Sequence, residues 1–179
     1  MRLVLAAAVL LTSAACRPAP SKPPVLAKYD QATGKLSQLT VNWAKDGNPN
    51  VISYMDGTKF VRIEIDADED GKVDRWEYYG PTQRVDRVGV SRANDGKEDA
   101  WVIQGPDGTV SRIEVSTKHD GRVNRTEFYN QDELTRVEED TDADGRVDKW
   151  EEYESGVLVK VSFDTARSGN PTTTLDYRK

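Results

Sequence analysis

Cysteine and histidine are nearly absent from this chain of 179 residues, which contains only Cys16 and His119. A single cysteine excludes an intrachain disulfide and a zinc site built from paired cysteines. The sequence also lacks a nucleophile elbow, a phosphate-binding glycine loop and an HExxH motif. His119 lies in a glycine-containing turn, where we predict a solvated residue. These absences predict a protein that is not an enzyme.

A hydrophobic run long enough to span a bilayer is also missing, because the most apolar stretch covers only residues 3–11. This stretch follows Met-Arg and precedes small residues, an order typical of a signal peptide at residues 1–15. The Ala-Ala-Cys that ends at Cys16 resembles the lipobox of bacterial lipoproteins. The resemblance implies lipidation of Cys16 and a membrane anchor in the cell envelope, and Arg17 favours the outer membrane. The alternative is ordinary cleavage that leaves a free thiol.

Residues 16–24 contain four of the eight prolines and are predicted to form a stiff tether between the lipid and the folded domain. The remaining residues, 25–179, are enough for one domain. Acidic residues outnumber basic ones by 31 to 25, and the isoelectric point is about 4.9. This balance argues against nucleic acid as a partner and against an electrostatic grip on anionic lipid.

An Asp-Gly pair, or its remnant, recurs along the domain at a period of 24 or 25 residues. A fixed period of this kind indicates a repeat architecture. Apolar residues spaced two apart flank each turn, which predicts β-hairpins. We therefore predict an all-β fold, an antiparallel β-meander of about six hairpin repeats. The glycines that mark the repeats are Gly47, Gly71, Gly96, Gly121, Gly145 and Gly169.

The alternation also predicts which side chains share a face of the sheet. Ile63 and Ile65 are expected on one apolar face with Trp76 and Tyr78. A flat sheet would expose this face, so we expect a curled or barrel-like sheet, or one docked on something else. The opposite face is expected to carry a charged ladder that consists of Arg62, Arg87, Arg112, Arg136 and Lys160.

Two repeats contain a complete twelve-residue loop, DADEDGKVDRWE at residues 66–77 and DTDADGRVDKWE at residues 140–151. Each loop has acidic side chains at positions 1, 3, 5, 9 and 12 and glycine at position 6, the pattern of an oxygen-ligand calcium loop. Glu77 and Glu151 are expected opposite Asp66 and Asp140, where each glutamate could close the shell with both oxygens. The candidate ligands are Asp66, Asp68, Asp70, Lys72, Asp74 and Glu77 in the first loop and Asp140, Asp142, Asp144, Arg146, Asp148 and Glu151 in the second, with Lys72 and Arg146 at position 7.

These loops resemble EF-hand loops, but a period of 24 or 25 leaves too few residues for two flanking helices. The repeat is more similar to the DxDxDG repeats of secreted proteins, such as thrombospondin type 3 repeats, and to MORN-type hairpin repeats of bacterial envelope proteins. The resemblance implies calcium as cofactor and a structural or binding role in the envelope. The partner stays open between a polysaccharide, peptidoglycan and another envelope protein. The degenerate copies, which begin at Asn42, Ser91, Ser116 and Asp164, are expected to be hairpin turns.

An alternative function is a carbohydrate-active or other hydrolytic enzyme that uses acidic residues in a groove of the sheet. Such an enzyme needs a singular pair of carboxylates. The acidic residues here recur at ligand spacing in successive repeats, which favours the calcium-binding interpretation.

The first prediction concerns the anchor. Replacing Cys16 with serine should release the protein into the soluble periplasmic fraction and abolish incorporation of labelled palmitate, because the lipidated thiol is gone. The measurement is cell fractionation with radiolabelling, and wild-type protein that takes up no label would contradict the prediction.

Overall fold

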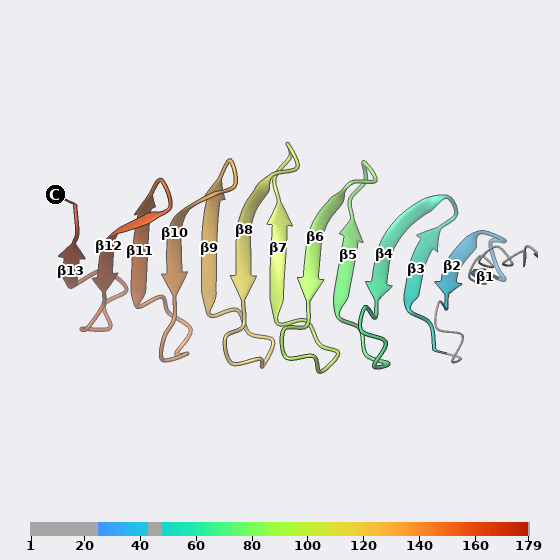
Figure 1. The fold of residues 1–179 in the computed structure, drawn as a ribbon, viewed down its shortest axis with the longest axis horizontal. Coiled ribbons are helices and arrows are strands. Elements are labelled where there is room, and N and C mark those ends of the chain that lie inside the picture. Colours follow the sequence, from blue (N-terminus) through green and yellow to red (C-terminus); the bar gives the residue numbers. More distant parts are fainter. Residues whose placement is uncertain (1–24, 43–47, 179) are drawn as a thin grey trace, which may run out of the picture.

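The computed structural model describes residues 25–42 and 48–178, so the predicted signal peptide, Cys16 and the tether lie outside the described residues. The described part contains no helix that is long and apolar enough to cross a membrane. Thirteen antiparallel strands form one sheet in which spatial order follows chain order, as Figure 1 shows. The strands are β1 (Val25–Tyr29), β2 (Leu36–Val41), β3 (Val51–Asp56), β4 (Lys59–Ile65), β5 (Arg75–Tyr79), β6 (Val85–Val90), β7 (Ala100–Gln104), β8 (Val110–Val115), β9 (Arg125–Asn130), β10 (Glu133–Glu139), β11 (Lys149–Glu154), β12 (Val157–Phe163) and β13 (Thr173–Asp176).

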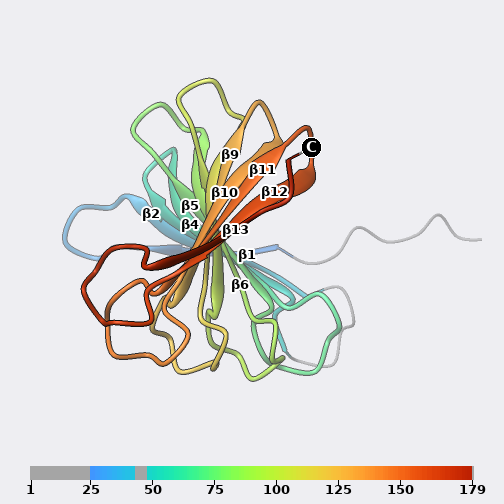
Figure 2. The ribbon, with the colours of Figure 1, turned by 90° about the vertical axis from the view of Figure 1, so that its left-hand side faces the viewer.

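The predicted all-β antiparallel meander is therefore confirmed. Of the expected shapes, a barrel is wrong, because the described strands do not close on themselves. The sheet is open, and no other described element covers either of its faces (Figure 1). Seen along its length, the sheet has strands that fan about a common axis (Figure 2), as the normal twist of β-sheets requires.

The connections differ between the two ends of the strands. The loops that follow β4, β6, β8, β10 and β12 all lie at the same end of the strands (Figure 1). We call this side of the sheet the loop edge, and the shorter turns lie at the other end of the strands. Each loop spans nine residues, as between the paired residues Ile65 and Arg75. The backbone N–H of the first loop residue donates to the carbonyl of the ninth residue of the preceding loop, for example from Ser91 to Asp74 at 2.8 Å. Neighbouring loops are thereby joined side by side.

The odd length of the loop decides which side chains share a face. Ile63 pairs with Glu77, and Glu64 pairs with Trp76, so the isoleucine and the tryptophan point to opposite faces. The predicted common apolar face is wrong, because it assumed a loop with an even number of residues. A one-residue difference moves every side chain of the second strand to the other face.

Each face consequently mixes apolar and charged side chains. One face, which we call the aliphatic face, has Glu77, Glu127 and Glu151 between rows of branched residues. The other, the arginine–aromatic face, alternates cations with aromatic or apolar side chains. The central row of the aliphatic face is Leu39, Ser53, Ile63, Glu77, Val88, Val102, Ile113, Glu127, Val137, Glu151 and Val161, and that of the arginine–aromatic face is Tyr54, Arg62, Tyr78, Arg87, Ile103, Arg112, Phe128 and Arg136.

Side chains on neighbouring strands bury one another's apolar surface, as a second layer would in a β-sandwich. The Arg62 guanidinium lies 4.4 Å from the Tyr54 ring centre, and that of Arg136 lies 4.2 Å from the Phe128 ring centre. Such contacts bury apolar ring surface under amphipathic side chains and add cation–π attraction. The Arg87 guanidinium lies 5.5 Å from the ring centre of Trp101, and both Trp76 and Trp101 are only 8% exposed.

The second prediction tests whether this single layer has a true core. Val137 is 1% exposed between Glu127 and Glu151, so Val137→Ala should lower the free energy of unfolding by about 1–3 kcal/mol. The same change at Val157, which is 63% exposed, should cost less than about 0.5 kcal/mol. Chemical denaturation of both variants provides the measurement, and equal losses would show that burial within the sheet is unimportant.

Candidate metal centres

The first complete loop is held in shape by its own carboxylates. Asp66, at position 1, accepts hydrogen bonds from the backbone N–H of Glu69 at 2.8 Å and of Gly71 at 2.9 Å. Asp74, at position 9, accepts from the N–H of Ala67 at 2.7 Å. Gly71 has a φ of 86°, a conformation that favours glycine, so the sixth position needs a residue without a side chain.

The degenerate loops keep the same backbone hydrogen bonds with other side chains. The Ser116 hydroxyl accepts the N–H of Gly121 at 3.2 Å, as Asp140 does for Gly145 at 2.8 Å. At position 9, Asn124 accepts the N–H of Thr117 at 2.8 Å. Positions 1 and 9 therefore require a hydrogen-bond acceptor for the turn itself, and a carboxylate there is not by itself a sign of metal.

The structure does bring three of the predicted ligands of each complete loop together. One carboxylate oxygen from each residue lies within 4.8 Å of the others in both groups. These groups, which we call the aspartate groups, could each hold a metal ion. They are Asp66, Asp68 and Asp74 in the first loop and Asp140, Asp142 and Asp148 in the second.

The residues at positions 5 and 7 lie beside these groups and contact each other. Asp70 accepts the backbone N–H of Lys72 at 2.8 Å and pairs with its ammonium group at 3.1 Å. In the second loop, Asp144 accepts the backbone N–H of Arg146 at 2.9 Å. In these positions the side chains of Asp70 and Asp144 cap the turn and do not belong to the groups of three.

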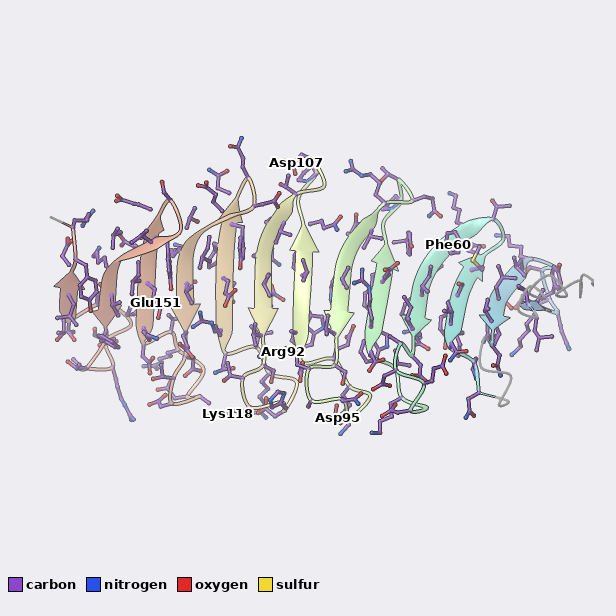
Figure 3. All side chains as sticks on the ribbon, viewed as in Figure 1. Phe60, Arg92, Asp95, Asp107, Lys118 and Glu151 are labelled. Carbon is purple, nitrogen blue, oxygen red and sulfur yellow. The ribbon has the colours of Figure 1, made fainter. Side chains whose placement is uncertain are left out.

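The glutamates predicted at position 12 lie elsewhere. Glu77 pairs with Ile63 instead of Asp66, and Glu151 stands on β11 (Figure 3), opposite Val137 instead of Asp140. The expectation that these glutamates lie opposite the first aspartates is wrong, for the reason of loop length given above. Their carboxylates contact neighbours on their own strands, and that of Glu151 also lies 3.9 Å from Arg125 on β9. Neither glutamate belongs to the aspartate groups.

Each of these glutamates belongs to a cluster that sequence reasoning missed. Glu151 pairs with Lys149 at 2.7 Å and accepts the Tyr153 hydroxyl at 2.8 Å. Burial raises the pKa of Glu151, but the bonds from Lys149 and Tyr153 outweigh it and leave the pKa below its ordinary value. Burial and the bond to Glu151 raise the pKa of Tyr153 to about 12.

The signal for these glutamate clusters was present in the sequence as a basic residue two before, and a tyrosine two after, each glutamate. Residues i and i+2 of a strand share a face, so the three side chains can meet. The clusters are Arg75, Glu77 and Tyr79; Arg125, Glu127 and Tyr129; and Lys149, Glu151 and Tyr153.

Comparisons with known proteins do not identify a family. No protein-family model matches the chain, and no curated protein matches it. Among solved structures, a GtfA/B complex is 11% identical with a TM-score of 0.44, and the similarity covers 63% of this chain and 21% of that one. For a mutant of S. aureus TarM in complex with Fondaparinux, alpha-GlcNAc-glycerol and UDP, the identity is 14%, the TM-score 0.30 and the coverage 62% and 19%. The chain spans about a fifth of the length of each, and similarity at this level indicates no activity.

The third prediction concerns pH. Burial raises the pKa of Asp99, but hydrogen bonds from the N–H of Arg92 and Ala93 and from His119 lower it by more, so the pKa lies below its ordinary value. A depressed carboxyl pKa gives stability that is present above the unfolded pKa and is lost as the pH falls through the folded pKa. Asp99→Asn should therefore reduce the loss of stability between about pH 5 and pH 2, measured by denaturation at each pH.

The control for this experiment is Asp132→Asn, the same substitution in an exposed turn at the other end of the strands, where the side chain accepts the N–H of Val110 at 3.2 Å. It should change the acid loss less than Asp99→Asn does, because Asp99 accepts hydrogen bonds from Arg92, Ala93 and His119. Identical acid profiles for the wild type and Asp99→Asn would contradict the prediction. The predicted solvation of His119 is only partly correct, because its ring is 44% exposed but contacts the buried Asp99 carboxylate.

Proposed function

We propose that this chain is an envelope-anchored lipoprotein whose loop edge binds calcium and that acts as a structural or binding module without catalysis of its own. The observation that carries the proposal is the pair of aspartate groups. Both lie in the two complete DxDxDG loops, and in the described residues no other loop has such a group.

The chemistry of these groups favours calcium over other metals. All candidate ligand atoms are oxygens, which suits a hard cation and disfavours zinc, since zinc prefers nitrogen and sulfur. The groups are partly exposed, so water can fill the remaining positions of a flexible shell of six to eight oxygens. Magnesium demands a tighter octahedron and releases its water reluctantly. Three carboxylates with water fit a weak site of the extracellular kind.

A bound ion would stabilise the edge of the sheet. Three carboxylates this close repel one another when all are ionised, and a dication between them relieves that repulsion. The sequence contains one cysteine and so no intrachain disulfide, and among the described residues no second layer supports the sheet, so its loops depend on local contacts. Calcium would therefore hold the carboxylates of each complete loop together and stabilise the loop.

The proposed anchor agrees with the position of the first strand. β1 begins at Val25, directly after the predicted tether, and forms one end of the sheet (Figure 1). A chain lipidated at Cys16 would hold the sheet at the membrane by this end, in the bacterial cell envelope and by analogy at the outer membrane. Both uncovered faces would be open to an envelope protein or a polysaccharide.

The hydrolase alternative has no comparable support. Cavities at the loop edge are lined by several carboxylates, among them Asp120, Asp140 and Asp144, but these residues occupy the periodic positions of the loops and do not form a singular pair. A groove on the aliphatic face contains one carboxylate, that of Glu127. That carboxylate already binds Arg125 and Tyr129.

The fourth prediction tests the metal. A ligand that binds only the native state stabilises it by RT ln(1 + [L]/Kd), so a few millimolar calcium at a Kd of about 10⁻⁴–10⁻³ M should add about 1–2 kcal/mol per site. Thermal unfolding should occur several degrees higher in calcium than in chelator, and magnesium should have a much smaller effect. Equal melting temperatures in calcium and chelator would reduce both loops to hairpin turns.

Variants test whether the calcium effect depends on the aspartate groups or only on the negative charge of the loops. Replacing Asp68 and Asp142 by asparagine removes the charge at position 3 but keeps an acceptor, so most of the calcium effect should disappear. Asp95→Asn, in a loop without an aspartate group, should keep it. Calorimetry should count two ions per wild-type chain.

A further inference from the structure

The fourth residue of each loop is the point at which one repeat reaches the preceding one. This residue has a positive φ in all five loops that are described in full. In three of them its side chain contacts a carboxylate of the loop before it. The five residues are Glu69, Asn94, His119, Ala143 and Arg167, and the three contacts are Asn94 with Asp68, His119 with Asp99, and Arg167 with Asp142.

The first aspartate group receives a neutral amide. The Asn94 amide nitrogen lies 3.0 Å from an oxygen of Asp68 and 3.4 Å from one of Asp70. An asparagine side chain carries an oxygen and a nitrogen of nearly the same shape, and its orientation follows the partner. Rotation by half a turn would present the amide oxygen, a calcium ligand, to the same group. The Lys72 ammonium group donates to the backbone carbonyl of Asn94 at 3.1 Å, and this bond joins the two loops.

The second aspartate group receives a charge. The Arg167 guanidinium lies 3.0 Å from an Asp142 oxygen. A guanidinium has no acceptor atom, so the Arg167 side chain cannot become a ligand. It neutralises the carboxylate that a cation needs and places a positive charge beside the site.

We infer that the fourth residue of the following loop determines how tightly each complete loop binds calcium. This inference rests on the proposed function. Asn94 makes the loop at residues 66–74 the tighter site by adding an oxygen from the next repeat, so that the ion bridges two repeats. Arg167 makes the loop at residues 140–148 the weaker site by acting as a competing internal cation.

The size of the effect follows from exposure. Arg167 is 76% exposed, and an ion pair in water stabilises by at most about 1 kcal/mol, which corresponds to about fivefold in affinity. Removing the guanidinium should therefore tighten the second site by up to about fivefold.

The experiment exchanges the two residues in backgrounds that leave one site active. Asp142→Asn with Asp144→Asn isolates the first loop, and Asp68→Asn with Asp70→Asn isolates the second. Calcium chloride is titrated by calorimetry into the folded full chain. We expect the isolated first loop to bind more tightly than the second, Arg167→Asn to tighten the second, and Asn94→Arg to weaken the first.

A second readout separates ligation from a purely structural role. The side-chain amide resonance of Asn94, assigned by its loss in Asn94→Ala, should shift when calcium is added to the isolated first loop. If Asn94→Arg does not fold, Asn94→Ala should still weaken the first site by removing the amide, and alanine already occupies this loop position at Ala143.

The outcomes distinguish the inference from its premise. Equal calcium affinities of the two loops, unchanged by Arg167→Asn and Asn94→Arg, would overturn the inference and leave calcium binding intact. An Asn94 side-chain resonance that does not shift when calcium is added would do the same. No calcium binding in the wild type or any variant would overturn the proposed function, and the inference with it.

Discussion

Cross-strand contact between charged and apolar side chains is the interaction on which this structure depends. A single-layer sheet has no second layer to remove its apolar surface from water, so each strand must be covered by its two neighbours. Arginine suits this role because it covers a ring while its guanidinium pairs with a glutamate, as with Arg62 and Glu64 at 2.7 Å. The composition, rich in charge and moderate in apolar residues, is what such a sheet requires.

Carboxylates within the apolar rows are the cost of this arrangement, and the sheet compensates for each of them locally. Glu77, Glu127 and Glu151 each have a cation and a tyrosine hydroxyl on the same strand, which satisfies a charge that would otherwise be costly to bury. On the arginine–aromatic face, Gly89 occupies a position at which three other repeats have glutamate, namely Glu64, Glu114 and Glu138. A Cβ at Gly89 would collide with the Glu98 carboxylate, which comes from the loop and pairs with Arg87 at 3.1 Å.

At the loop edge, different positions of the calcium-loop pattern hold the turn and provide the carboxylates of the aspartate group. Positions 1 and 9 hold the turn by accepting backbone N–H groups, and serine, asparagine or threonine can perform that task. Position 3 has little part in the turn, and in the degenerate loops it is Ala93, Lys118 or Ala166. A repeat can therefore lose its aspartate group and still fold, which is why the fold persists through copies that differ in their acidic residues.

The sequence by itself determined the all-β class, the antiparallel meander, the repeat period and the location of the two aspartate groups, because periodicity and loop spacing are local properties. It did not determine the faces of the sheet, since these depend on whether the loop between two paired strands has an odd or even number of residues. The same parity places Glu77 opposite Ile63 and Glu151 opposite Val137, instead of opposite Asp66 and Asp140 as expected. Only the tertiary structure decided that the sheet stays open and that Asn94 and Arg167 meet aspartates about 25 residues away, because both depend on how neighbouring repeats lie side by side.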